Sequence, residues 1–298
     1  MDTRNWNSHT PVILVTNDDG IGSPGLIAAV EAARTLGHVV VAAPTEQQTA
    51  RGRSMIGEKG DTFHPVDLLL SPIDTGHSVE AWHIAASPAL VVRHALATLF
   101  IERYPDLVIS GINYGENLGN NIMISGTLGA AFQGAAQGVP ALAMSRETDI
   151  EHHFSYGELD WIDATRITGR WAKRLLEVTF DGPYVHPEGR VPRDGSRDHP
   201  AAKLPFDVLK VDIPAASTPT TEERLTRLSQ RHYFMSYMEN AGPDTPLGSA
   251  KTHIDIDPQG LAKDDDIYAV AVDGVVSVTP LQLDNTAPLE ATRSALGI

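Results

Sequence analysis

The chain has 298 residues, which is enough for one large domain or two small domains with a sizeable core. Its formal net charge of −15 argues against DNA or RNA as a partner, because a negatively charged protein repels a long polyanion. The absence of cysteine excludes disulfides, thiolate metal sites and a cysteine nucleophile, and it fits a cytoplasmic protein. The sequence contains no run of about 18 apolar residues, so we predict no membrane span.

The first predicted unit is a strand, a helix and a second strand. Residues 12–16 (VILVT) form a continuous apolar, β-branched run that ends at a turn signal, and residues 38–43 (HVVVAA) form a second such run. Between them, Ser23 is a good N-cap and Pro24 suits the first helical position, so we expect a helix from there to about residue 36. This unit predicts parallel strands joined by a right-handed crossover.

The same alternation continues along the chain. A polar loop is expected at 45–60, followed by short strands within 62–84. The pattern then predicts helices at about 88–104, 125–137 and 159–177, and strands at 106–110, 140–145 and 208–213. These elements predict an α/β fold with a doubly wound, mostly parallel sheet.

The C-terminal third has a different composition. Residues 181–205 are rich in proline, glycine and charge and are expected to form a flexible surface insertion. Residues 230–256 and 267–278 are expected to form β-hairpins, the second with a turn at Asp273-Gly274. We therefore predict a single domain over residues 1–298, with a core of about 11–180 and 206–229 and a C-terminal hairpin part of about 230–280.

Polar clusters follow three of the predicted strands, and open parallel sheets bind ligands at the carboxyl ends of their strands. The clusters are Asn17-Asp18-Asp19-Gly20, the loop that contains Thr49, and residues 111–117 (GINYGEN), which we expect to be an irregular loop. If the three strands are neighbours, these clusters converge on one site.

Asp18 and Asp19 are the strongest candidates for metal binding. Adjacent side chains of a strand point to opposite faces, so both carboxylates reach one site only where the backbone leaves the strand, which Gly20 and Gly22 permit. Two carboxylates with neutral oxygens make a site that suits Mg²⁺ or Mn²⁺. The alternative is a polar turn in which one aspartate caps the next helix.

Phosphate-binding candidates follow later in the chain. Asn113 and Asn117 either ligate a metal or hold a phosphate oxygen, or they only close local turns. Ser125-Gly126-Thr127 open a predicted helix, where free N–H groups beside hydroxyls form an anion site; the alternative is a capped, tightly packed helix.

Two polar runs are expected outside this site. His152-His153 lie in a polar stretch and are predicted at the surface, and residues 264–266 (DDD) are predicted to form a solvated turn.

Five sequence blocks together resemble the SurE family of metal-dependent 5′-nucleotidases. ILVTNDDGIGSPGL is similar to the N-terminal signature of that family, and PDLVISGINYGENLG and ISGTLGAAFQG are similar to its second and third blocks. LKVDIP and DGVVSVTPLQLDNT are similar to its two later blocks. The resemblance covers nearly the whole chain in order.

The resemblance implies an α/β core with an extended β-hairpin that subunits exchange, which gives homodimers or homotetramers. It implies one divalent ion per subunit, Mg²⁺ or Mn²⁺, held by Asp18, Asp19, Thr49 and Asn113. The positions that it places around the phosphate are Asn17, Gly111, Asn117, Ser125, Gly126 and Thr127, and the expected catalytic residues are Asp18, Asp19, Asn117 and Ser125.

The activity implied by the resemblance is hydrolysis of nucleoside 5′-monophosphates, with 3′-monophosphates also accepted, to nucleoside and phosphate. Several positions depart from the family pattern: Leu90 and Gln133 replace acidic residues, Ile124 replaces a tyrosine, Thr49 replaces the usual serine, and Ala86-Ser87 replace Gly-Thr. Two alternatives stay open for this reason. One is a phosphatase of the same family with a non-nucleotide substrate, and the other is a non-catalytic relative that binds metal or nucleotide.

Overall fold

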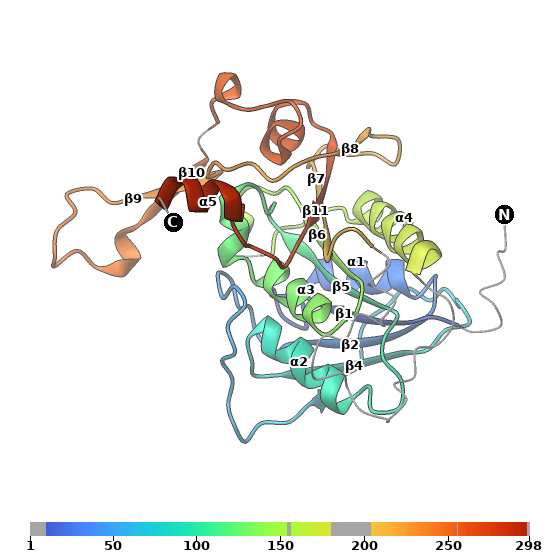
Figure 1. The fold of residues 1–298 in the computed structure, drawn as a ribbon. Helices are drawn as coiled ribbons and strands as arrows, with labels where there is room; N and C mark the ends of the chain where they lie inside the picture. The colour runs from blue at the N-terminus through green and yellow to red at the C-terminus, as the bar shows by residue number, and fades with distance from the viewer. Residues whose placement is uncertain (1–9, 154–155, 180–203, 255, 297–298) are drawn as a thin grey trace.

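The computed structural model describes residues 10–153, 156–179, 204–254 and 256–296. Its centre is a nine-stranded sheet in the order β3-β4-β2-β1-β5-β6-β7-β11-β8 (Figure 1). The bounds of these strands are β1 (Val12–Thr16), β2 (His38–Pro44), β3 (His64–Pro65), β4 (Val79–Ile84), β5 (Leu107–Tyr114), β6 (Ala141–Arg146), β7 (Val208–Ile213), β8 (Glu223–Leu225) and β11 (Val276–Leu281). Only the β3–β4 and β7–β11 pairs of this sheet are antiparallel, so the predicted doubly wound, mostly parallel sheet is confirmed.

Helices cover both faces of the sheet. Helices α1 (Pro24–Ala33) and α4 (Ile162–Thr179) pack on one face, and α2 (Pro88–Thr98) and α3 (Gly126–Ala136) pack on the other. Strand β1 shows why its run is apolar throughout: Ile13 and Val15 belong to the first core layer, whereas Leu14 belongs to the second.

The order of the strands makes β2, β1 and β5 neighbours, as the predicted convergence of their polar ends requires. One local prediction was wrong, because residues 111–114 are not an irregular loop but continue β5 to Tyr114. The pairing of β5 with β6 shifts in register between Ser110 and Asn113. Gly111 makes this passage possible: its φ is +132°, and a Cβ atom there would lie 2.2 Å from the carbonyl oxygen of Met144.

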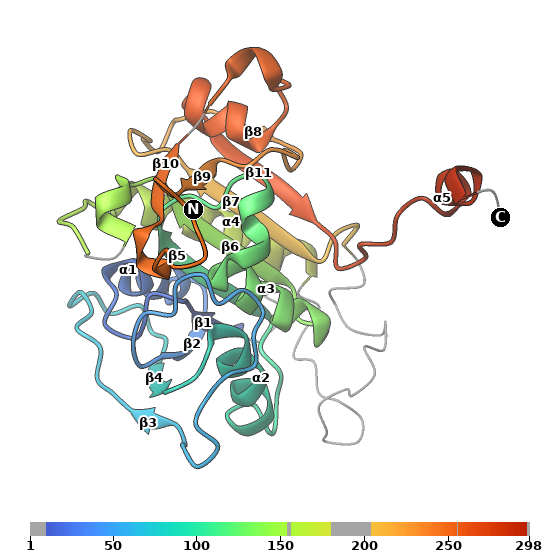
Figure 2. The same ribbon diagram turned by 90° about the vertical axis from the view of Figure 1, so that its left-hand side faces the viewer.

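The C-terminal part contains one of the two predicted hairpins. Strands β9 (Phe234–Tyr237) and β10 (Lys251–Ile254) pair antiparallel and lie to one side of the central sheet (Figures 1 and 2). The hairpin predicted at 267–278 was wrong: η6 (Tyr268–Val272) is a π-helical turn, and the chain then enters β11 of the central sheet. A short apolar run such as YAVAV does not distinguish a buried helical turn from a buried strand.

Almost all of the insertion predicted at 181–205 lies outside the described residues. In the described ranges, no helix combines the length and the apolar character that crossing a bilayer requires. Helix α5 (Leu289–Leu296) ends the described chain and lies apart from the sheet (Figure 2).

Candidate functional site

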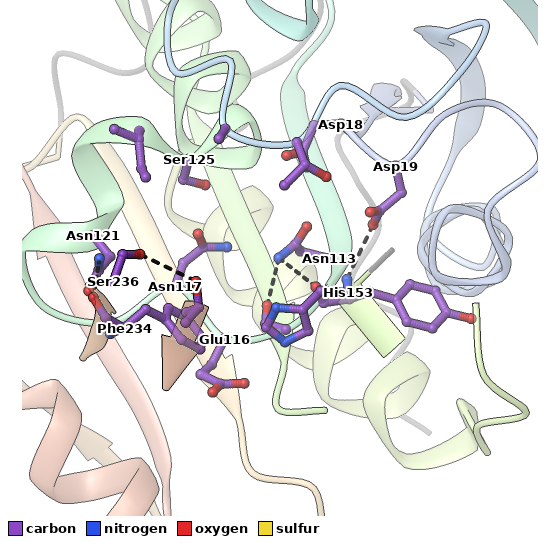
Figure 3. Close-up of a pocket in the computed structure, with 16 residues that line it drawn as sticks. Asp18, Asp19, Asn113, Glu116, Asn117, Asn121, Ser125, His153, Phe234 and Ser236 are labelled. Atoms are coloured by element: carbon purple, nitrogen blue, oxygen red, sulfur yellow. Dashed lines mark hydrogen bonds between the residues drawn. The ribbon is translucent and has the colours of Figure 1, made fainter. Parts of the chain in front are cut away.

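A cavity of about 260 Å³ opens at the carboxyl ends of β1 and β5. Figure 3 shows that it gathers side chains from segments far apart in the sequence. All predicted metal-ligand and catalytic residues line it, namely Asp18, Asp19, Thr49, Asn113, Asn117 and Ser125. The convergence that the strand order suggests is therefore present in the structure.

Asp18 and Asp19 lie in a tight turn directly after β1. The side chain of Asn17 closes this turn, because its Nδ2 donates to the carbonyl of Gly20 (3.0 Å) and its Oδ1 accepts from the N–H of Gly20 (3.2 Å). Gly20 has a φ of +98°, which takes the backbone out of the strand. Both carboxylates can therefore border the same cavity instead of pointing to opposite faces of the sheet.

Each carboxylate is held by its own donors. Oδ1 of Asp18 accepts from Oγ1 of Thr127 at 2.6 Å. Asp19 accepts from the backbone N–H of Tyr114 and from Nε2 of Gln47, both at 3.2 Å. The two side chains are only 5% and 2% exposed, so little water is available to solvate them.

Burial dominates the electrostatics of this pair. Loss of solvation raises the pKa of Asp18 to about 6, against the smaller lowering effect of its hydrogen bond with Thr127. Loss of solvation, and then the charge of Asp18, raise the pKa of Asp19 well above its usual value. Two adjacent, buried carboxylates of this kind are stabilised in their charged forms by a cation.

The donors around the pair fit a divalent cation. Nδ2 of Asn113 donates to the carbonyls of Tyr114 (3.2 Å) and Gly115 (2.6 Å), which turns the amide oxygen toward Asp18 (Figure 3). Thr49 adds a hydroxyl to the cavity wall. In the part of the chain that the structure describes, no three His, Asp or Glu side chains cluster, so a cation here has two carboxylates and neutral oxygens, a set that suits Mg²⁺ or Mn²⁺.

The start of α3 packs directly on Asp18. Ser125 is the N-cap, and its Oγ accepts from the N–H of Leu128 at 3.2 Å. Gly126 has no room for a side chain, because a Cβ atom would lie 2.7 Å from Oδ2 of Asp18. The first N–H groups of this helix thus lie beside Asp18, where they can bind an anion.

This close approach gives a sharp prediction for Gly126→Ala. The added methyl group displaces the carboxylate of Asp18, and we expect turnover of a phosphate monoester to fall by about 10- to 100-fold, since small misplacements of reacting groups have effects of this size. Phosphate release and thermal unfolding measure the two effects. Gly22→Ala is the matched control, because nothing lies within 4 Å of its added Cβ atom. Unchanged activity of Gly126→Ala contradicts the arrangement.

Asn117 is held from two sides. Its Nδ2 donates to Oγ of Ser145 at 2.8 Å, and its backbone N–H donates to Oδ1 of Asp212 at 2.7 Å. Ser145 and Asp212 are themselves cross-strand neighbours in β6 and β7. The amide of Asn117 is thereby fixed at the cavity wall.

Four predicted phosphate-binding positions are not in the wall of the cavity. Asn17 uses its amide in the turn with Gly20, and Gly111 is packed against β6. Gly126 and Thr127 contact Asp18 from behind, Gly126 by its close approach and Thr127 by its hydroxyl. A role for these four residues at the phosphate stays a prediction.

The opposite wall was not foreseen. It includes Phe234, Ser236 and Thr252 of the β9–β10 hairpin, together with Asn121 and His153. Oδ1 of Asn121 accepts from the N–H groups of Tyr233 (2.8 Å) and Phe234 (3.0 Å), which attaches the hairpin to the site. No local pattern marks these residues, because a contact across more than a hundred residues leaves no periodic signal.

Two expectations about polar residues were wrong. His153 is half-buried and lines the cavity, with its ring edge-on to Phe234 at a centroid distance of 5.4 Å. Asp266 is fully buried, although residues 264–266 were expected to form a solvated turn.

A further acidic residue, Glu116, lies in the wall of the cavity, and burial raises its pKa to about 7.

Three of the departures from the family pattern, at Leu90, Gln133 and Ile124, have distinct surroundings. Leu90 packs against the apolar layer of α2 and α3. Oε1 of Gln133 accepts from Nε and Nη2 of Arg53 at 3.2 and 3.1 Å. Only Ile124 lines the cavity, where its side chain is 56% exposed.

Comparisons with known proteins agree on one family. Residues 13–235 match the family model described as "Survival protein SurE". The chain is 36% identical to the 5′-nucleotidase SurE of Methanocella arvoryzae and 35% identical to that of Thermococcus kodakarensis, with 92% of this chain and 93% of each relative covered. The crystal structure of the SurE protein from Aquifex aeolicus superposes with a TM-score of 0.68 at 28% identity, covering 97% of this chain and all of the other. The chain belongs to the SurE family.

Proposed function

We propose that this protein is a metal-dependent phosphomonoesterase that hydrolyses nucleoside 5′-monophosphates, and also 3′-monophosphates, to nucleoside and phosphate. The observation that carries the proposal is the pair of adjacent buried carboxylates, Asp18 and Asp19, which border one cavity together with Ser125 at the start of α3. The names of the relatives, which are 5′-nucleotidases, support the reaction and the substrate class.

Asp18, Asp19, Asn113 and Thr49 would hold one Mg²⁺ or Mn²⁺ ion. When bound, such an ion polarises a phosphate oxygen and lowers the pKa of a coordinated water. The raised pKa values of both aspartates support this assignment, because a cation removes the cost of burying two negative charges.

The residues of the chain carry the remaining tasks. The hydroxyl of Ser125 and the first N–H groups of α3 stabilise negative charge on the phosphate oxygens. Asn117 orients the phosphate through its amide. Attack of water forms a new P–O bond and breaks the ester P–O bond; one proton of the water passes to Asp18 or Asp19 and from there to the leaving alkoxide, which departs as the alcohol.

Assembly and location belong to the same proposal. The β9–β10 hairpin exposes Met235, Tyr237 and Ile254, and we propose that this surface joins subunits into a homodimer or homotetramer. The cysteine-free composition supports a cytoplasmic location. The net charge of −15 supports a small phosphate monoester rather than a nucleic-acid polymer as substrate.

One alternative has an observation in its favour. Ile124 is an exposed apolar side chain in the cavity wall at a position where the family usually has tyrosine, which favours a phosphatase with a different leaving group. A non-catalytic binder is disfavoured by the complete set of oxygen donors around Asp18 and Asp19.

The test is phosphate release from AMP, GMP, CMP and UMP, their 3′ isomers and p-nitrophenyl phosphate, each with Mg²⁺, Mn²⁺ or EDTA. We expect metal-dependent release that favours nucleotides. Turnover of p-nitrophenyl phosphate alone indicates the alternative phosphatase. No release with any metal, from folded protein that still binds Mn²⁺, refutes the enzymatic proposal.

A further inference from the structure

A buried ionic network lies behind the candidate site. Lys210 of β7 is fully buried and forms ion pairs with Asp212 and, at 3.0 Å, with Asp266. Lys210 and Asp212 are two residues apart in one strand, so their side chains share a face of the sheet. Asp266 reaches them from the segment before η6.

The two carboxylates of the network bind the backbone of the site loop. Oδ1 of Asp212 accepts from the N–H of Asn117 at 2.7 Å, and Oδ2 of Asp266 accepts from the N–H of Gly119 at 3.1 Å. Lys210 therefore holds together two acceptors that fix N–H groups only two residues apart. The loop between β5 and η1 (Asn120–Ile124) is thus attached to β7 by a charged side chain, in addition to the apolar packing of its Leu118.

The same network reaches the base of the hairpin segment. Oδ1 of Asp266 accepts from the N–H groups of Ser229 and Ile267, both at 2.9 Å. Both carboxylates of the network are thus satisfied by backbone donors as well as by Lys210.

A buried ionic network of this kind adds little to the free energy of unfolding compared with apolar packing. Removing three charged groups from water is costly, and apolar side chains of similar volume are often as stabilising. An ionic network instead fixes the positions of particular backbone groups, because its carboxylates accept hydrogen bonds from specific N–H groups. The backbone N–H that Asp212 holds is that of Asn117, which lines the cavity (Figure 3).

We propose that Lys210, Asp212 and Asp266 are positioning residues that fix Asn117 for the reaction. The inference rests on the proposed function, because it takes Asn117 to contact the phosphate. Asp212 fixes the backbone of Asn117, while its cross-strand neighbour Ser145 fixes the amide group from β6. Together these two contacts set both the position and the rotation of one side chain.

The test is a double-mutant cycle on phosphate release, with Asp212→Ala, Asn117→Ala and the pair combined. We expect Asp212→Ala to lower kcat by about 10-fold or more with little change in KM, since it leaves the N–H of Asn117 without its acceptor. Asp212→Asn keeps an acceptor oxygen and should recover most of kcat. In the Asn117→Ala background, Asp212→Ala should have almost no further effect on kcat.

A matched control separates positioning from general loss of structure. Asp106 is also a buried aspartate that accepts a backbone N–H, that of Val12 at 2.8 Å, but at the amino ends of β1 and β5, opposite the ends that carry the cavity. We expect Asp106→Ala to lower the melting temperature without lowering kcat. If Asp212→Ala does not fold, Ser145→Ala removes the second contact to Asn117 and should give the same non-additive loss.

The outcomes are distinct. Losses in kcat that add in the double variant, or an equal loss in Asp106→Ala, overturn the positioning role while leaving the proposed function intact. An Asn117→Ala variant with full activity overturns both the contact of Asn117 with phosphate and the inference. Absence of phosphate release from the wild-type protein overturns the proposed function itself.

Discussion

We expect Asp19→Asn to lower metal-dependent phosphate release by at least about 100-fold, the scale of effect found when one group that stabilises transition-state charge is removed. The substitution preserves shape and keeps an oxygen that can accept from Tyr114 or Gln47. It removes one of the two charges that would hold the cation. The fold should therefore persist while the reaction fails.

The stability of the same variant gives a second readout. Because burial and the charge of Asp18 raise the pKa of Asp19, the folded state without metal binds a proton at a pH where the unfolded chain has lost it. The stability of the metal-free protein therefore falls as pH rises above the usual carboxyl range. In EDTA near neutral pH, Asp19→Asn should unfold at a higher temperature than the wild type.

Thermal unfolding with and without Mn²⁺ completes this experiment. The wild type should gain stability from Mn²⁺ in proportion to the occupancy of the site, and Asp19→Asn should gain far less. Asp264→Asn, at an aspartate whose side chain is 63% exposed, is the control that should change neither activity nor the response to metal. Full activity of Asp19→Asn, or an undiminished response to Mn²⁺, contradicts the metal assignment.

The largest loss of stability is expected for Lys210→Met. Removing the cation leaves the carboxylates of Asp212 and Asp266 buried without their common partner, and breaking a buried pair in this way costs about 3–5 kcal/mol. The wild-type network, with one lysine and two aspartates, has a net charge of −1; without the lysine, the two aspartates carry a net charge of −2. Urea denaturation measures the loss in the free energy of unfolding.

The charge count provides the control for this prediction. Lys210→Met combined with Asp212→Asn restores the net charge of −1, so the double variant should be more stable than Lys210→Met alone. Lys251→Met removes a lysine from an exposed pair with Glu239 and should cost less than about 1 kcal/mol. A Lys210→Met variant as stable as Lys251→Met refutes the importance of the buried cation.

The sheet and one side of the site could be predicted from the sequence because their signals are local. Runs such as VILV (12–15) and VVVAA (39–43) are apolar at every position because both faces of the sheet are covered by helices. Ser23-Pro24 marks a helix start at the residue where α1 begins. The sequence left open whether β2, β1 and β5 are neighbours; the structure places them side by side, which brings Asp18, Thr49 and Asn113 together.

The other side of the site could not be predicted in the same way. Phe234 and Thr252 reach the cavity through a hairpin whose contacts with Asn121 span more than a hundred residues, and such pairing leaves no periodic trace. Lys210 and Asp212 did leave a signal, since two charges alternate within an otherwise apolar strand. Their partner Asp266 belongs to the acidic triplet 264–266, whose composition is typical of a solvated turn, so its buried position was not predicted.

The hairpin wall has a consequence for how this enzyme can be changed. The carboxylates follow a strand of the central sheet, whereas Phe234, Ser236 and Thr252 lie on two short strands that, among the described residues, pair only with each other. Substitutions in those strands reshape the space for a leaving group without moving the carboxylates. We therefore expect libraries restricted to the cavity-lining hairpin residues Phe234, Ser236 and Thr252 to change substrate choice while the carboxylates stay in place.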